Sequence, residues 1–294
     1  MSIWKNYHLA NSIQDALIIL QDTPGEVSLI AGGTDLLLDL QQGRHVPVDT
    51  LVDVTRIPEM CALEIRQDRL FIGAALPLNQ IVASALVKDH AEALHESCGL
   101  IGGPQVRNTA TLGGNVGHAL PAADGTISLV ALDARAEIAS LAGNRIVEMK
   151  ALFTGPGRSA LQPRREFITG FSLALRRPGQ ASAFRRVMRP QGVAIAILNM
   201  AVWLQRGEDG RIEDIRIAIG PAGPTPLRAQ AAEQALRGQQ FNEAAISDAV
   251  KALLGEARLR TSPHRATADY RRSLADVLLR QTLQTAWERA AENE

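Results

Sequence analysis

Ala31-Gly32-Gly33-Thr34-Asp35 is the stretch on which the interpretation of this 294-residue chain rests. The mostly apolar residues 27–30 before it predict a short buried strand, and residues 35–40 after it predict a helix. The glycine pair therefore falls on a strand-to-helix turn, where it can adopt positive φ and let a ligand approach the backbone closely. Free N–H groups at the start of a helix attract anions. The stretch therefore predicts a phosphate-binding turn.

A second stretch, Thr111-Leu112-Gly113-Gly114-Asn115, repeats the glycine pair. In both stretches a short polar residue follows the glycines, Thr34 or Asn115, and can donate a hydrogen bond to a phosphate oxygen with little bulk. One such pair is more often an ordinary tight turn, but two favour a two-sided diphosphate clamp. Asp35 fits a helix start better than a phosphate contact, because its charge repels the anion. Neither stretch is a dinucleotide fingerprint or a P-loop.

Composition excludes several other classes of protein. The chain has 31 Lys and Arg against 31 Asp and Glu, and its arginine pairs are scattered, so nucleic-acid binding has little support. Its two cysteines, Cys61 and Cys98, are too few for an iron-sulfur cluster on this chain. No Ser/His/Asp set, metal-ligand cluster or carboxylate pair stands out. We therefore predict neither a catalytic residue nor a metal site.

The start of the chain lacks the charged and apolar regions of a signal peptide. The longest apolar stretch, residues 193–204, is interrupted by Asn199 and is too short to span a bilayer. A soluble, cytoplasmic protein is expected.

The periodicity predicts an α+β protein in three parts, residues 1–55, 56–177 and 178–294. The first part contains a helix capped by Ser12 and strands over residues 27–31 and 50–54. The second begins with a hairpin and continues with these helices and strands: helices 78–86, 89–98 and 125–133, and strands 62–66, 69–73, 136–141, 144–149 and 166–171. The third is an antiparallel sheet of strands 181–186, 194–205 and 211–220, followed by three helical stretches.

The segment around the second glycine pair contains further elements of a pattern. Gln105-Val106-Arg107-Asn108 precedes the pair, and Ala123-Asp124 follows it. With the first stretch upstream, the chain resembles the FAD-binding, medium-sized subunit of the molybdenum hydroxylases, the family of bacterial xanthine and carbon monoxide dehydrogenases. Each motif alone is weak, but their joint order is specific. The resemblance extends through residues 70–74 to Tyr270-Arg271-Arg272, essentially the whole chain.

The resemblance implies a two-lobed FAD-binding domain of the vanillyl-alcohol-oxidase (PCMH) type, with lobes over residues 1–55 and 56–177. It also implies a C-terminal domain, residues 178–294, with a three-stranded antiparallel sheet and a helical bundle. The residues that would lie along the FAD diphosphate are Ala31, Gly32, Gly33, Thr34, Asp35, Thr111, Gly113, Gly114 and Asn115. Asp124 would bind ribityl or ribose hydroxyls, and Arg107-Asn108 would brace the loop.

The resemblance also places Arg185 near the flavin ring, where a cation raises the electron affinity of the ring. The chain departs from the family at residues 76–78 and 190–193, and the second departure leaves the register of Arg185 and Arg189 open. His118 stands where some members also have histidine, but a structural loop histidine is the favoured interpretation.

The implied function is the FAD-carrying electron-transfer subunit of a heteromeric molybdenum hydroxylase. A large molybdopterin subunit would oxidise the substrate, and a small [2Fe-2S] subunit would pass electrons here and on to an acceptor such as NAD. The expected assembly is a dimer of heterotrimers. A non-redox nucleotide-binding or scaffold subunit with the same fold is the alternative. A free-standing flavin oxidoreductase is disfavoured by the missing acid-base set.

Overall fold

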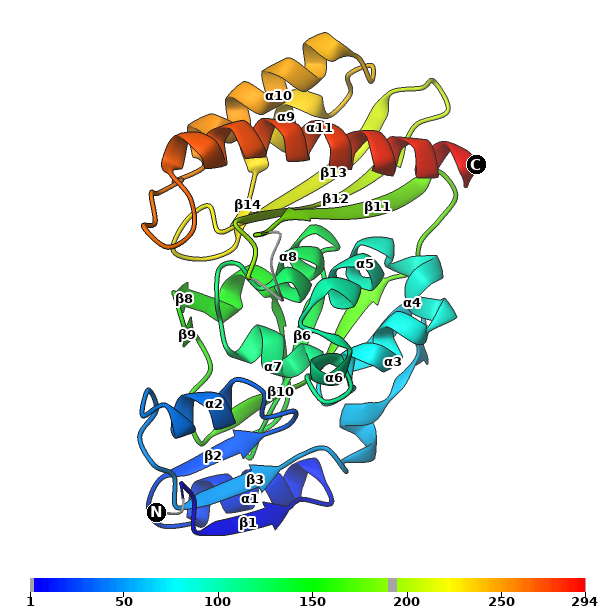
Figure 1. The fold of residues 1–294 in the computed structure, drawn as a ribbon. Helices are drawn as coiled ribbons and strands as arrows, with labels where there is room; N and C mark the ends of the chain where they lie inside the picture. Colours follow the sequence, from blue (N-terminus) through cyan, green and yellow to red (C-terminus); the bar gives the residue numbers. More distant parts are fainter. Residues whose placement is uncertain (1–2, 190–194, 294) are drawn as a thin grey trace.

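The computed structural model describes residues 3–189 and 195–293. These residues form three stacked layers, each with its own sheet and each made of a successive part of the chain (Figure 1). We refer to them as the N-terminal segment (residues 3–57), the central segment (residues 58–177) and the C-terminal segment (residues 178–293). Each segment contains both helices and strands, so the predicted mixture of the two is confirmed.

The N-terminal segment is a parallel three-stranded sheet in the order β1-β3-β2. Its elements are β1 (Asn6–Leu9), α1 (Ile13–Asp22), β2 (Val27–Ile30), α2 (Leu36–Gln41) and β3 (Thr50–Asp53). Ser12 caps α1 as predicted, because its hydroxyl accepts a hydrogen bond from the Asp15 amide at 3.0 Å. Strand β1 was not predicted. Its half-exposed residues carry no alternation, and only pairing with β3 defines it.

The central segment is an antiparallel five-stranded sheet in the order β4-β5-β10-β6-β7, covered by short helices. Its strands are β4 (Leu63–Arg66), β5 (Arg69–Gly73), β6 (Arg135–Ser140), β7 (Arg145–Glu148) and β10 (Glu166–Ala174), with a small ribbon of β8 (Phe153–Gly155) and β9 (Arg158–Ser159). Its helices are α3 (Leu78–Ala83), α4 (Ala85–His90), α5 (Glu92–Leu100), α6 (Pro104–Arg107), α7 (Leu112–Gly117) and α8 (Asp124–Ala131), with 3₁₀ turns at Pro58–Cys61 and Met149–Leu152. The two helices predicted over residues 78–98 are three, because Ser84 is extended and caps α4.

The C-terminal segment holds an antiparallel sheet of four strands rather than three. The strands are β11 (Gln180–Val187), β12 (Leu198–Arg206), β13 (Ile212–Gly220) and β14 (Leu227–Arg228), and the helices are α9 (Gln230–Leu236), α10 (Glu243–Glu256) and α11 (Ala268–Glu292). The additional strand, β14, has two residues and pairs with β13 just after the proline-rich connector. Strand β12 begins at Leu198, so residues 195–197 of the predicted strand lie before it, and residue 194 lies outside the described residues. None of the helices in residues 3–189 and 195–293 has the length and apolar character needed to cross a bilayer.

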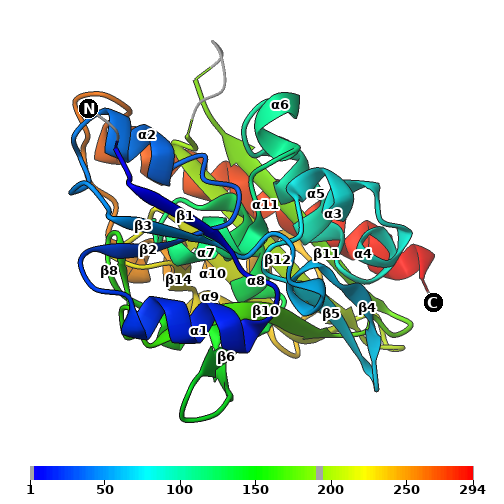
Figure 2. The same cartoon turned by 90° about the horizontal axis from the view of Figure 1, so that it is seen from below.

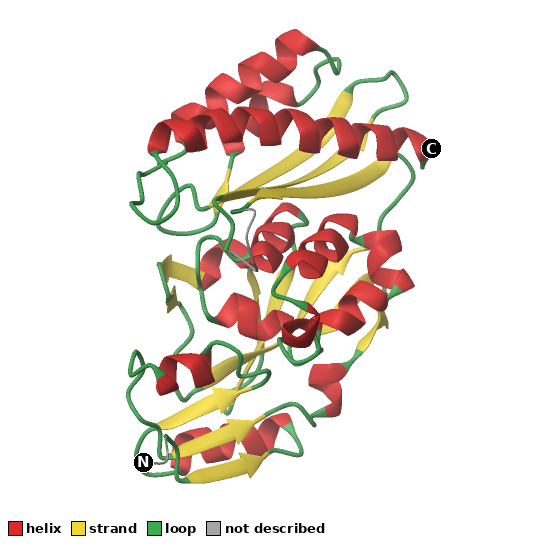
Figure 3. Ribbon diagram, in the orientation of Figure 1, coloured by secondary structure: helices red, strands yellow, loops and turns green. Residues whose placement is uncertain are grey.

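The C-terminal sheet is covered on both faces. Helix α11 lies across one face, and α5 and α8 of the central segment pack against the other, as Figures 1 and 3 show. The view from below shows the N-terminal sheet in front, with α1 and α2 on its two sides (Figure 2). The C-terminal sheet is therefore joined firmly to the central segment, since it shares that segment's helices as its second layer.

Two carboxylates of α5 make the joint with β11, which is an edge strand. Glu92 accepts a hydrogen bond from the Ser182 amide at 2.8 Å, and Glu96 accepts one from the Phe184 amide at 2.7 Å. Arg289 of α11 donates to the other oxygen of Glu96 at 2.5 Å. These contacts satisfy edge amides that otherwise would be exposed for pairing with another chain. They also fix the position of the N-terminal half of β11 against α5.

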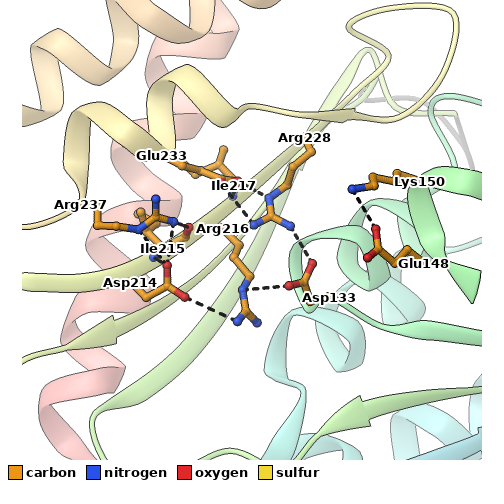
Figure 4. A network of polar contacts seen from close by, with 10 residues as sticks. All are labelled: Asp133, Glu148, Lys150, Asp214, Ile215, Arg216, Ile217, Arg228, Glu233 and Arg237. Carbon is orange, nitrogen blue, oxygen red and sulfur yellow. Dashed lines mark hydrogen bonds and ion pairs between the residues drawn. The ribbon is translucent and has the colours of Figure 1, made fainter.

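A second polar joint involves Asp133, in the turn after α8. Arg228 donates to its carboxylate at 2.8 Å, and the Arg216 guanidinium lies 3.4 Å from it and over the Trp203 ring. Figure 4 shows both arginines reaching from the C-terminal segment to Asp133. The sheet is thus held to the central segment at two separate places.

Replacing Glu96 with alanine is expected to destabilise the protein by about 1.5–3 kcal/mol, because the Phe184 amide and Arg289 lose a charged partner. The matched control is Glu148→Ala, which removes an exposed carboxylate whose one ion-pair partner among the described residues is Lys150. It should change the stability by less than about 0.5 kcal/mol. Urea denaturation measures both. Equal effects for the two variants would show that Glu96 does not hold the joint.

Candidate functional site

A cavity of about 750 Å³ opens between the N-terminal and central segments and reaches the end of β11. Both glycine stretches line it, one from each side. All predicted site residues except Arg185 are in its wall: Ala31, Gly32, Gly33, Thr34, Asp35, Thr111, Gly113, Gly114, Asn115 and Asp124. The volume lies within the range of ligand-binding cavities. The two stretches are therefore brought together at one cavity, although they are far apart in the sequence.

The first stretch combines close backbone contact with unused amide groups. A Cβ atom on Gly32 would lie 2.2 Å from the carbonyl oxygen of Thr109, and Gly33 has φ of +66°. Only glycine fits both conditions. The amides of residues 32–35 donate to no acceptor in the part of the chain that the structure describes. Successive free amides beside a cavity form a cradle for an anion.

The second stretch forms the cap and first residues of the short helix α7. Thr111 caps this helix by accepting a hydrogen bond from the Gly114 amide at 3.1 Å. The Gly113 amide donates to the Ala74 carbonyl at 2.9 Å, and a Cβ atom on Gly113 would lie 2.5 Å from the same oxygen. These amides are used inside the protein. The second stretch therefore provides a bare wall rather than a second amide cradle.

Asn115 is the polar side chain that the second stretch places in the cavity wall. Its Oδ1 accepts a hydrogen bond from the Thr126 amide at 3.3 Å, which orients the side chain. Its Nδ2 has no acceptor among the described residues. The free donors of the two stretches are thus the backbone of residues 32–35, the Thr34 hydroxyl and the Asn115 amide nitrogen.

His118, at the C-terminal end of α7 three residues after the second stretch, contacts the first stretch. Its Nδ1 lies 3.4 Å from the Asp35 carboxylate, and both residues line the cavity. The hydrogen bond between them raises the pKa of His118 and lowers the pKa of Asp35. Asp35 is at the start of α2 but its side chain makes no capping hydrogen bond. In the structure, the contact of the Asp35 side chain is therefore the ion pair with His118. The sequence had indicated only a structural loop histidine at residue 118.

Asp124, the first residue of α8, is buried at the end of the cavity near β11. Arg186 donates to one of its oxygens at 2.5 Å, and Asn199 donates to the other at 2.6 Å. Burial raises the pKa of Asp124, while the Arg186 charge and the Asn199 hydrogen bond act against that rise. Both carboxylate oxygens thus have protein partners. Asp124 holds Arg186 in the cavity wall.

The expectation for Arg185 needs correction. Arg185 is exposed and donates to the Thr285 hydroxyl of α11 at 3.0 Å, on the opposite face of the C-terminal sheet. Because side chains alternate along a strand, its neighbour Arg186 points toward α8 and the cavity. The predicted departure at residues 190–193, which left this register open, lies outside the described residues.

The apolar residues of the cavity wall were not predicted from the sequence. It includes residues from all three segments: Leu29, Leu38, Ile101, Val106, Leu120, Phe167, Ile168 and Ile195. No motif marks these positions. The predicted brace is present, since Arg107 donates to the Gly102 and Ile101 carbonyls at 2.8 and 3.2 Å. Within residues 3–189 and 195–293, no three His, Cys, Asp or Glu side chains are grouped so that they could hold a metal ion.

Comparison with known proteins gives a consistent result over nearly the whole chain. The "Putative xanthine dehydrogenase FAD-binding subunit" of Escherichia coli (strain K12) is 30% identical, over 96% of this chain and 95% of its own length. The carbon monoxide dehydrogenase medium chain of Hydrogenophaga pseudoflava is 28% identical, over 97% and 98%.

Solved structures agree. A chain of carbon monoxide dehydrogenase from Hydrogenophaga pseudoflava superposes with a TM-score of 0.91 at 29% identity, covering 97% of this chain and 98% of that one. A chain of quinoline 2-oxidoreductase from Pseudomonas putida 86 gives a TM-score of 0.88 at 26% identity, with the same coverage. The match includes the C-terminal sheet as well as the glycine stretches.

Two family models match successive parts of the chain. Residues 182–286 match the "CO dehydrogenase flavoprotein C-terminal domain". Residues 3–173, which contain both glycine stretches and Asp124, match the "FAD binding domain in molybdopterin dehydrogenase". The chain belongs to the FAD-binding subunit family of the molybdopterin-dependent dehydrogenases, such as xanthine and carbon monoxide dehydrogenase.

Proposed function

We propose that this chain is the electron-transfer subunit of a heteromeric molybdenum hydroxylase, and that it passes electrons from a [2Fe-2S] partner subunit to an external acceptor such as NAD. The observation that carries the proposal is the cavity between the two glycine stretches, with the free amides of residues 32–35 on one side and Asn115 on the other. The family match supplies the cofactor, FAD.

The residues present fit FAD. The bare backbone at Gly32, Gly33 and Gly113 leaves room for an extended diphosphate, and the free donors of the first stretch suit its negative charge. The apolar wall suits the rings. Bound flavin can take up electrons singly and release them in pairs, so the protein has only to hold, tune and shield it. This explains why no acid-base set is needed.

The roles of the individual residues follow from their contacts. The amides of residues 32–35 and the side chains of Thr34 and Asn115 hold the diphosphate. Thr111, Gly113 and Gly114 form the opposite wall. Arg186 replaces Arg185 as the cation that raises the electron affinity of the flavin, and Asp124 orients it.

We retain the two lobes of the vanillyl-alcohol-oxidase type, residues 1–55 and 56–177, and the C-terminal domain, residues 178–294, as the division of the chain.

Partner subunits are part of the proposal. Relatives carry the names "medium chain" and "FAD-binding subunit", and one solved relative is described by its molybdenum cofactor. We infer a large molybdopterin subunit and a small [2Fe-2S] subunit, assembled with this chain as a dimer of heterotrimers. The substrate pocket then lies on another polypeptide.

The direct test mixes the FAD-loaded chain, without oxygen, with its chemically reduced [2Fe-2S] partner subunit. The visible absorbance of the oxidised flavin should decrease as the flavin is reduced, and it should recover when NAD or another acceptor is added. A flavin that stays oxidised beside a reduced partner would rule out the electron-transfer role. Titration with FAD and with ADP distinguishes the electron-transfer role from the scaffold alternative. The first predicts tighter binding of FAD than of ADP, and the second predicts no preference for FAD.

Gly32→Ala should weaken FAD binding about tenfold, because the added methyl group meets the Thr109 carbonyl and forces the two segments apart. The control is Gly99→Ala in α5, whose added methyl group would meet only Val82 at 3.9 Å. Flavin content per polypeptide after gel filtration reports the difference. The close-approach argument fails if both variants keep FAD equally well.

FAD retention should fall about fivefold as the pH rises from about 6 to 9, a loss of ~1 kcal/mol for a partly exposed charge pair. The reason is that His118 has a raised pKa, so its favourable charge is complete below its ordinary pKa and is lost as the pH rises through the raised value. Asp35 and Asp39 are the acids that face it. Equilibrium dialysis of FAD measures the profile.

His118→Asn should flatten this profile, and Asp35→Asn should move the fall to lower pH by removing the partner that raises the His118 pKa. An unchanged profile in His118→Asn would assign the pH dependence to another group.

A further inference from the structure

The loop between α10 and α11 and the first turn of α11, residues 257–272, are strongly basic. We call this segment the basic loop. It contains five arginines and a single acidic residue, Asp269: the arginines are Arg258, Arg260, Arg265, Arg271 and Arg272. The chain as a whole has no net charge. Four uncompensated positive charges within sixteen residues therefore form a local concentration of charge.

These five guanidinium groups are unpaired within residues 3–189 and 195–293. None of them makes a hydrogen bond or ion pair there, whereas arginines elsewhere, such as Arg228 and Arg280, have carboxylate partners. Arg271 is the extreme case, since it is 2% exposed and its buried Nε has no hydrogen-bond partner. An unpaired buried charge costs several kcal/mol. Such a group needs an anion that the described residues do not supply.

Local hydrogen bonds hold the basic loop in one shape. The Ser262 amide donates to the Ala266 carbonyl at 2.9 Å, and the Ala268 amide donates to the Thr261 hydroxyl at 3.0 Å. Thr267 caps α11, a helix of 25 residues whose positive dipole end adds to the charge. Burial, followed by the nearby charges of Arg265 and Arg260, lowers the pKa of Arg271. The like charges are thus held close together.

The basic loop lies at the end of the C-terminal segment that faces the cavity. Arg189, three residues after Arg186, donates to the His264 carbonyl, and the Arg258 amide donates to the Ala222 carbonyl at 2.8 Å. Figure 1 shows the loop at the start of α11, beside the ends of β11 and β13. A ligand held here is therefore on the same side as the cofactor cavity but outside its wall.

We propose that the basic loop is a second anion site that binds the phosphate or diphosphate group of a small-molecule ligand, with Arg271 as its innermost contact. A singly charged carboxylate leaves most of the positive charge uncompensated, whereas a diphosphate matches it. The planar guanidinium donates two parallel hydrogen bonds to such an oxyanion. The site is distinct from the glycine stretches and does not depend on electron transfer.

The test titrates FAD-saturated protein with pyrophosphate, ADP and inorganic phosphate by calorimetry, with adenosine as the uncharged probe. Saturation with FAD fills the glycine stretches, and flavin absorbance reports any loss of cofactor separately. Binding of a phosphate probe, but not of adenosine, is expected. Arg265→Gln and Arg271→Lys should weaken that binding about tenfold, the value of one charged hydrogen bond.

The matched control is Arg177→Gln, an exposed arginine at the other end of β11 that also lacks a side-chain partner among the described residues. It should bind the probes like the unmodified chain. Arg265 is exposed, so Arg265→Gln should fold normally. It therefore tests phosphate binding by the basic loop even where Arg271→Lys fails to fold. If the chain retains no FAD, the difference between Arg265→Gln and Arg177→Gln still isolates the basic loop from the cavity.

Tighter binding of ADP than of pyrophosphate supports the site and identifies a nucleotide, and equal binding supports it with the phosphate groups alone as the recognised part. The proposal is overturned if no phosphate probe binds, or if the basic-loop variants bind as well as Arg177→Gln. It is also overturned if only an acidic surface of a partner subunit engages these arginines, because that result makes the segment a protein-docking surface.

Discussion

A contact without side chains, between Gly32 and the carbonyl of Thr109, is the constraint on which the rest of the site depends. It brings the N-terminal sheet against the central segment near the start of both glycine stretches. Any side chain at residue 32 would separate them, and the cavity between them would lose its shape. The positive φ of Gly33 then turns the chain so that the next amides lie beside the cavity with no acceptor among the described residues. Packing and anion binding thus have the same requirement for glycine.

The C-terminal sheet completes the cavity through its position rather than through a motif. Because α5 and α8 form its second layer, the end of β11 is fixed against Asp124. The alternation of side chains along β11 then decides which arginine reaches the cavity and which reaches α11. A shift of one residue in the pairing of β11 with β12 would exchange Arg186 and Arg185. The polar joints at Glu96 and Asp133 are therefore part of the site's geometry, although they lie away from it.

Local patterns predicted the elements and the glycine stretches well, because caps, periodicity and turn residues act over a few residues. Ser12 and the Gly33 turn are examples. Features that depend on distant contacts were missed. Strand β1 exists because β3 pairs with it, and α7 forms because Gly113 packs on Ala74. The choice between Arg185 and Arg186 needs the sheet's orientation, and the apolar wall draws on three segments at once.

The two glycine stretches look equivalent in sequence, but their hydrogen bonds give them different tasks. The Gly114 and Gly113 amides of the second donate to the Thr111 side chain and the Ala74 carbonyl, whereas the amides of residues 32–35 in the first have no acceptor among the described residues. An anion between them therefore receives its hydrogen bonds mainly from the first stretch, while the second stretch forms the opposite wall of the cavity. The same reasoning separates the arginines: those with carboxylate partners join the segments, and those of the basic loop, which have no side-chain partner in the described part of the chain, retain the capacity to bind an anion. In both cases, the groups whose hydrogen bonds remain unused are the ones left to hold a ligand.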